Sequence, residues 1–164
     1  MHAARNLLMQ ALSLKPESPL NCNNLAWILA TGPSPVRDAN QAETLARSAM
    51  ASDPEQAMYL NTLGVALFRT GKYGEAIETL EKSLSRGERF NQPYDLLFLA
   101  MCHAQAGDLE KARQYQNRAT QVIAEQASGQ SKLWHDELFE FNQEAIAILA
   151  RCESAAQDMS SKSD

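Results

Sequence analysis

Apolar and small residues recur along this chain at the spacing of amphipathic helices. In the middle of the sequence they occupy Leu60, Leu63, Gly64 and Leu67. This is the i, i+3, i+4, i+7 pattern that places side chains on one face of a 3.6-residue helix. Gly71 interrupts the pattern, and glycine is well suited to the left-handed conformation that ends many helices. The pattern therefore predicts a helix that stops just before Gly71.

A second helical pattern follows directly, so the two predicted helices form a hairpin. Its apolar face contains Tyr73, Ala76, Ile77, Leu80 and Leu84. Small residues, Gly64 on the first helix and Ala76 on the second, suit a close approach of the two backbones. A single hairpin cannot bury both of its apolar faces, so further hairpins are expected beside it.

The same hairpin pattern occurs again on both sides of this segment. Downstream, Leu99-Ala100, Gly107-Asp108 and Ala112 repeat it at a shift of 36 residues. Upstream, Leu25-Ala26 and Ala42 repeat it with four extra residues in the turn. The sequence therefore predicts an all-α protein built from repeated helix pairs.

The repeat resembles the tetratricopeptide repeat, with the pattern W-x2-L-G-x2-Y, then A-x3-F, then P. The matching positions are Leu60-x2-Leu63-Gly64-x2-Leu67 and Ala76-x3-Leu80. The chain departs from the pattern in two ways: no unit has the Trp and the Tyr together, and Glu88 replaces the terminal Pro of the middle unit. The resemblance covers about residues 3 to 150 and implies a right-handed α-solenoid of antiparallel helix pairs. Two stretches are also similar to repeat modules of large bacterial regulatory proteins, some with a serine/threonine kinase domain.

The repeat register sets the expected boundaries of one domain over residues 1–153. An N-terminal half repeat should occupy residues 3–15, where a second helix has no first helix before it, as in a piece cut from a longer protein. The other expected boundaries are repeats at 19–53, 57–86 and 93–125, a capping helix at 131–153 and a disordered tail at 154–164. The capping helix is predicted from a polar outer face and from a stripe with steps of four and three residues, as a terminal helix requires. That stripe is Trp134, Leu138, Phe141, Ala145, Ile148 and Cys152.

Composition narrows the classes of function. A net charge of −5 argues against a nucleic-acid partner, which needs a basic face. No run of about 18 apolar residues favours a membrane span, and no signal-peptide pattern is visible at the N-terminus. The three cysteines are widely separated and odd in number, which favours free thiols in a reducing compartment. We therefore expect a cytoplasmic protein.

Candidate chemistry is sparse along the chain. His135-Asp136-Glu137 are consecutive, and consecutive helical residues point about 100° apart, so they do not converge on one metal ion. Cys102 and His103 are also consecutive and do not converge on one ion. His103 falls on the predicted interior face, where a core histidine is favoured. No phosphate-binding loop or nucleophile motif occurs. We expect neither an enzyme nor a bound cofactor or metal.

The resemblance implies that the first helices of the repeats line a concave groove that takes peptides. The groove positions predicted from the repeat are Asn23, Asn24, Trp27, Asn61, Thr62, Val65, Phe68, Arg69, Tyr94, Leu97, Phe98, Met101 and Gln105. Asn amides are able to bond an extended peptide backbone, and Trp27, Phe68 and Phe98 are candidate anchors. The alternative is that these aromatic rings pack between neighbouring first helices. The lysines used by family members that grip a C-terminal carboxylate are missing.

Two functional interpretations follow. The first is a scaffold that binds a peptide or helical segment of another protein in this groove. The second is a structural segment of a longer superhelix, which self-associates through an open N-terminal edge at Leu7, Leu8 and Leu12.

Overall fold

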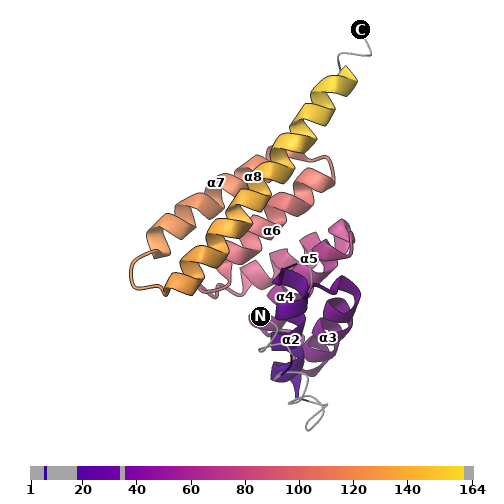
Figure 1. Ribbon diagram of the computed structural model, residues 1–164, viewed down its shortest axis with the longest axis vertical. Helices are drawn as coiled ribbons and strands as arrows, with labels where there is room; N and C mark the ends of the chain where they lie inside the picture. The colour runs from indigo at the N-terminus through magenta and orange to yellow at the C-terminus, as the bar shows by residue number, and fades with distance from the viewer. Residues whose placement is uncertain (1–5, 7–17, 34–35, 161–164) are drawn as a thin grey trace. The chain divides into compact units, whose positions relative to one another are not determined.

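The described part of the chain is helical, and its helices are joined by turns. The computed structural model describes residues 6, 18–33 and 36–160. The helices, labelled as in Figure 1, are α2 (Pro19–Thr31), α3 (Ala39–Ser52), α4 (Ala57–Arg69), α5 (Tyr73–Ser85), α6 (Gln92–Gln105), α7 (Leu109–Gln126) and α8 (Lys132–Ser160). Neighbouring helices pack in pairs, α2 with α3, α4 with α5, and α6 with α7. The predicted all-α fold of repeated helix pairs is confirmed.

The chain divides into two compact units, residues 1–86 and 87–164. Unit 1 contains the pairs α2/α3 and α4/α5, and unit 2 contains α6, α7 and α8. The turns within the last two pairs are short because Gly71 and Gly107 adopt φ angles of 78° and 85°, which glycine alone tolerates readily. The sequence placed both glycines correctly.

Helix starts in both units follow their sequence signals. Ser18 caps α2, with Pro19 in the first turn. The carboxylate of Asp38 accepts a hydrogen bond from the Gln41 backbone N–H, and Asp108 caps α7 in the same way. Each cap satisfies a backbone donor that the helix itself leaves unpaired.

A buried carboxylate joins the two helix pairs of unit 1. Glu43 on α3 accepts hydrogen bonds from Thr70 Oγ1 at 2.9 Å and from Lys72 Nζ at 2.6 Å, both in the turn between α4 and α5. Arg47, one turn along α3, donates to Glu43 at 3.0 Å and to Glu75 on α5 at 2.9 Å. Burial alone would raise the pKa of Glu43, but the hydrogen bonds from Lys72, Thr70 and Arg47 outweigh it and lower the pKa.

Helix α6 is the centre of unit 2. Its residues from Pro93 to Ala104 are all buried, and it packs against both α7 and α8. The Phe98 ring meets Phe141 of α8 edge-on at 5.2 Å between centroids, and the Tyr94 hydroxyl donates to Glu137 Oε2 at 2.9 Å. The predicted interior stripe of α8 from Trp134 to Ile148 is buried as expected.

Helix α8 is longer than the sequence analysis expected. Its 29 residues continue through Ser160, whereas the sequence analysis expected a disordered tail from residue 154. The last turns of α8 extend beyond the ends of α6 and α7 (Figure 1). The residues 161–164, most of the predicted half repeat at 3–15 and its edge at Leu7, Leu8 and Leu12 lie outside the described residues.

Candidate partner-binding surface

Helix α2 presents a mixed apolar and polar stripe on the side away from its core. The stripe contains Leu20, Asn24, Trp27 and Thr31, which follow each other at steps of four, three and four residues. Leu20 is 50% exposed, Asn24 is exposed, and Trp27 is half-buried. The sequence analysis predicted Asn24 and Trp27 as groove residues and missed Leu20, which lies in the first turn of α2.

Arg69, at the end of α4, is held beside α2. Its Nε donates to the Ala30 carbonyl oxygen of α2 at 3.1 Å, and its guanidinium carbon lies 5.2 Å from the centre of the Phe68 ring. A cation over an aromatic face is attracted by the ring quadrupole, so this arrangement restricts the long side chain. Arg69 therefore offers a positioned, half-buried cation in unit 1.

Asn23 adds a buried acceptor on α2. Its side chain is 3% exposed, and Oδ1 accepts no hydrogen bond from the residues that the structure describes. A buried amide oxygen without a donor is costly, because burial removes the water that would otherwise bond it. A backbone N–H of a bound peptide is a chemically suitable donor for this oxygen.

The other predicted groove residues of unit 1 lie in the packed interior of the protein. Asn61, Thr62, Val65 and Phe68 of α4 are all buried, with Phe68 7% exposed. The Phe68 ring lies 5.9 Å from the Tyr73 ring at the start of α5, within the same helix pair. Phe68 therefore supports the helix pair and presents little surface as a peptide anchor.

Most of the predicted groove residues of unit 2 also lie in the packed interior. Tyr94, Leu97, Phe98 and Met101 are buried, and only Gln105 of this set is exposed. Burial, together with the nearby Glu137 carboxylate, raises the pKa of Tyr94, so its hydroxyl stays a protonated donor. The Phe98 ring packs against Phe141 of α8.

Two shallow hollows occur on unit 2 outside the predicted groove. One of about 380 Å³ lies along α7 and α8, and its lining residues are Ile123, His135, Asp136, Leu138, Phe139 and Asn142. The other, of about 270 Å³, lies on α7 and is lined by Lys111, Gln114, Tyr115 and Arg118. Tyr115 stacks on the buried His103 ring at 5.3 Å, so His103 belongs to the packing of α6 against α7.

The described residues offer little for catalysis. No group of three or more His, Cys, Asp or Glu residues within residues 18–33 and 36–160 is arranged to hold a metal ion. Burial raises the pKa of the Cys102 thiol to about 12, which suppresses the reactive thiolate. None of the helices described in the structure has the length and apolar character needed to cross a membrane.

Comparison with known proteins identifies the repeats. No curated protein matches the chain. Two family models, both described as tetratricopeptide repeat, match residues 36–92 and residues 96–126, which together make up more than half of the chain. The first match includes α3, α4 and α5, and the second includes most of α6 and all of α7. With its paired helices and its Gly71 and Gly107 turns, the chain belongs to the tetratricopeptide-repeat family.

Proposed function

We propose that this chain is a protein-interaction scaffold that holds an extended peptide segment of a partner against α2 and the end of α4. Tetratricopeptide repeats generally mediate interactions between proteins, and an all-helical fold of this type is typically a scaffold without enzymatic activity. The proposal adds a location to that general role. Its site consists of Asn23, Asn24, Trp27 and Arg69.

The observation that carries the proposal is the combination of a buried free acceptor and an aromatic surface on one helix. Asn23 Oδ1 has no donor among the described residues, and Trp27 lies one helical turn away along α2. Indole rings are frequent anchors in interfaces because they bury a large apolar area and lose little conformational entropy. Arg69, fixed at the Ala30 carbonyl oxygen, supplies a cation for a peptide carbonyl or carboxylate.

The burial of each predicted groove residue decides whether a substitution there can test peptide binding. Phe68, an expected anchor, is 7% exposed, so a charged substitution there would unfold unit 1 before it tested binding. Trp27 is half-buried and Asn24 is exposed, so both are suitable for substitution. We therefore base the experiment on these two residues.

The experiment pans a random peptide library, displayed on phage, against the immobilised chain. Peptides selected by the unmodified protein are then measured by fluorescence anisotropy against Trp27→Ala, Asn24→Ala and the control Ser48→Ala, an exposed change on α3. We expect Trp27→Ala to weaken binding by about tenfold or more, a typical loss at an aromatic anchor, and Ser48→Ala to leave it unchanged. Selected peptides that bind all three variants equally, or a panning that selects none, would contradict the proposed site.

The three cysteines support the cytoplasm as the proposed compartment. Cys22 and Cys102 are buried and Cys152 is half-buried, and none of the three forms a disulfide with the described residues. Free thiols of this kind persist where the surroundings keep them reduced.

A further inference from the structure

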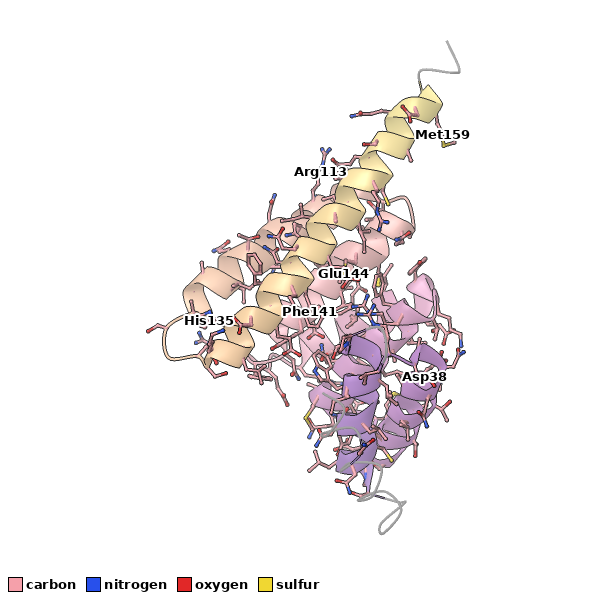
Figure 2. All side chains as sticks on the ribbon, viewed as in Figure 1. Asp38, Arg113, His135, Phe141, Glu144 and Met159 are labelled. Carbon is pink, nitrogen blue, oxygen red and sulfur yellow. The ribbon has the colours of Figure 1, made fainter. Side chains whose placement is uncertain are left out.

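Helix α8 holds most of the large apolar side chains that are exposed in the described chain. Phe139 is 64% exposed, Ile146 46%, Leu133 75% and Met159 73%, whereas only Leu20 and Phe90 are comparable elsewhere. Met159 lies in the part of α8 that extends beyond α6 and α7 (Figure 2). Several apolar side chains exposed on one helix often mark an interaction site.

Part of this apolar surface follows a regular second stripe along α8. The stripe consists of Lys132, Asp136, Phe139, Gln143, Ile146 and Ala150, all of them exposed. Its steps of four and three residues are those of a coiled-coil seam. Each member precedes by two residues, or about 200° around the helix, a member of the interior stripe that runs from Trp134 to the half-buried Cys152. The second stripe therefore lies on the side of α8 opposite to its contact with α6.

We propose that α8 pairs with α8 of a second copy of this chain through this second stripe, in antiparallel orientation and centred on Gln143. With Gln143 at the centre, Phe139 lies at the level of Ala147 of the second copy, and Ile146 lies at the level of Glu140. The large Phe139 of each copy therefore has a small residue opposite it, and it lies one residue along the helix from Ile146 of the other copy. Gln143, the polar residue between Phe139 and Ile146, also favours this register.

Charge explains why the second copy is the occupant and why it runs antiparallel. Centring on Gln143 brings Asp136 beside Arg151 of the second copy, and the two-fold symmetry repeats this pair at the other end. Arg151 is exposed and forms no ion pair with the described residues, while Asp136 is 57% exposed at its side chain. A parallel pairing would instead set Asp136 against Asp136 and Lys132 against Lys132, which is unfavourable.

The length of α8 is consistent with this occupant. Residues 154–159 are all exposed, and short helical segments without packing are only marginally stable in water. In the antiparallel arrangement, residues 147–154 of one copy lie along residues 132–139 of the other, so the first of these exposed turns gains a packing surface on the start of the second copy's α8.

Sedimentation velocity over a range of concentrations tests the association. We expect the unmodified chain to form a dimer and the double variant Phe139→Glu/Ile146→Glu to weaken it by about tenfold or more. Both positions are exposed, so circular dichroism should show unchanged helix content. The matched control is Leu133→Glu, which removes a more exposed apolar residue of the same helix outside the stripe and should leave the dimer intact.

Charge reversal tests the orientation. Asp136→Arg and Arg151→Asp should each weaken the dimer, and the combined variant should restore it, because the salt bridges re-form with opposite signs. In a Cys152→Ser background, Gln143→Cys should cross-link two copies through a disulfide across the two-fold axis, and Phe139→Cys should not.

Three results would overturn the proposal. A chain that stays monomeric at all concentrations shows that the stripe meets another protein, or a further helix, instead of a second copy. A dimer insensitive to Phe139→Glu/Ile146→Glu uses another surface. Efficient cross-linking of Phe139→Cys would show a parallel pairing.

Discussion

Gly64 shows how a single missing side chain permits the packing of α4 on α5. A Cβ atom at this position would lie 2.5 Å from Leu80 Cδ2, and Leu80 is fully buried. The sequence analysis paired Gly64 with Ala76 as small residues on the two helices, whereas the space left by Gly64 is filled by Leu80.

We predict that Gly64→Ala lowers the free energy of unfolding by about 1–3 kcal/mol, as overpacking of a core does. Gly74→Ala is the matched control, because a Cβ there meets no atom within 4 Å and position 74 lies in the first turn of α5. The control should raise stability by about 0.5–1 kcal/mol through the lower chain entropy of alanine. Urea unfolding followed by circular dichroism measures both, and equal effects of the two variants would contradict the packing argument.

Glu43 makes unit 1 sensitive to acid. We predict that Glu43→Gln destabilises the protein by about 1–3 kcal/mol at neutral pH, because Thr70, Lys72 and Arg47 lose a charged acceptor in a buried place. The comparison variant Glu78→Gln removes an exposed carboxylate from α5 and should change stability by less than about 0.5 kcal/mol.

The pH dependence of this difference has a defined sign. The folded pKa of Glu43 lies below its usual value of 4.5, so the carboxylate stabilises the folded state fully above that value. The stabilisation is lost as the pH falls through the lower, folded pKa. Urea titrations from pH 7 down to about 3 should therefore show the stabilities of the unmodified chain and Glu43→Gln converging, and a constant difference would contradict the prediction.

At the scale of elements, the Tyr94 hydroxyl contributes to the attachment of α8 to α6. We predict that Tyr94→Phe lowers the stability of unit 2 by about 1.5–3 kcal/mol, because it removes the hydrogen bond to the Glu137 carboxylate at 2.9 Å. Faster amide hydrogen exchange in residues 132–145 would report the loosened helix. The control Lys132→Gln breaks an exposed ion pair with Asp136 on the same helix and should have almost no effect.

The elements also show what could be read from the sequence. The hairpins, the glycine turns, the caps Asp38 and Asp108 and the buried stripe of α8 all follow from local patterns, and all are present. The burial of the predicted groove residues does not follow from such local patterns. A helical period identifies one buried face, but α6 is buried on nearly every side, so Leu97, Phe98 and Met101 lie in the interior although they fall outside the predicted stripe.

The helical end of α8 does not follow from the sequence pattern for a related reason. Residues 154–160 contain no large apolar residue except Met159, and a sequence without an apolar anchor suggests disorder. The preceding turns are packed in unit 2, and alanine, glutamine and methionine propagate a helix that is already nucleated. The second stripe of α8 is not evident in the sequence, because polar residues separate Phe139 from Ile146. Only the exposed fractions of these two side chains in the structure show that they remain uncovered.

For the whole molecule, the cysteines provide a reporter in each unit. Cys22 lies in unit 1 and Cys102 in unit 2, both buried, whereas Cys152 is half-buried. With a thiol reagent at pH 8, we predict that Cys152 reacts first in the folded protein and that Cys22 and Cys102 react only upon unfolding. For Cys102, a pKa of about 12 leaves about one thiolate in ten thousand at that pH.

A Cys152→Ser variant isolates the two buried thiols, and mass spectrometry of labelled peptides distinguishes them. Labelling of each should rise with urea in step with the loss of helix. Rapid labelling of Cys102 without denaturant would show that unit 2 opens far more readily than its packing indicates.

The unbroken length of α8 fixes both the distance and the rotation angle between its two ends. A helix of 29 residues measures about 43 Å at 1.5 Å per residue, so the first and last turns are held at a fixed separation without a flexible tether. Each inserted residue would rotate everything beyond it by about 100° as well as displace it. An insertion of seven residues after Cys152 would lengthen the rod by about 10 Å and keep the same side outward. An insertion of two residues would turn the far end of α8 to the opposite side. The number of residues in the helix therefore sets both the distance to its far end and the side toward which that end faces.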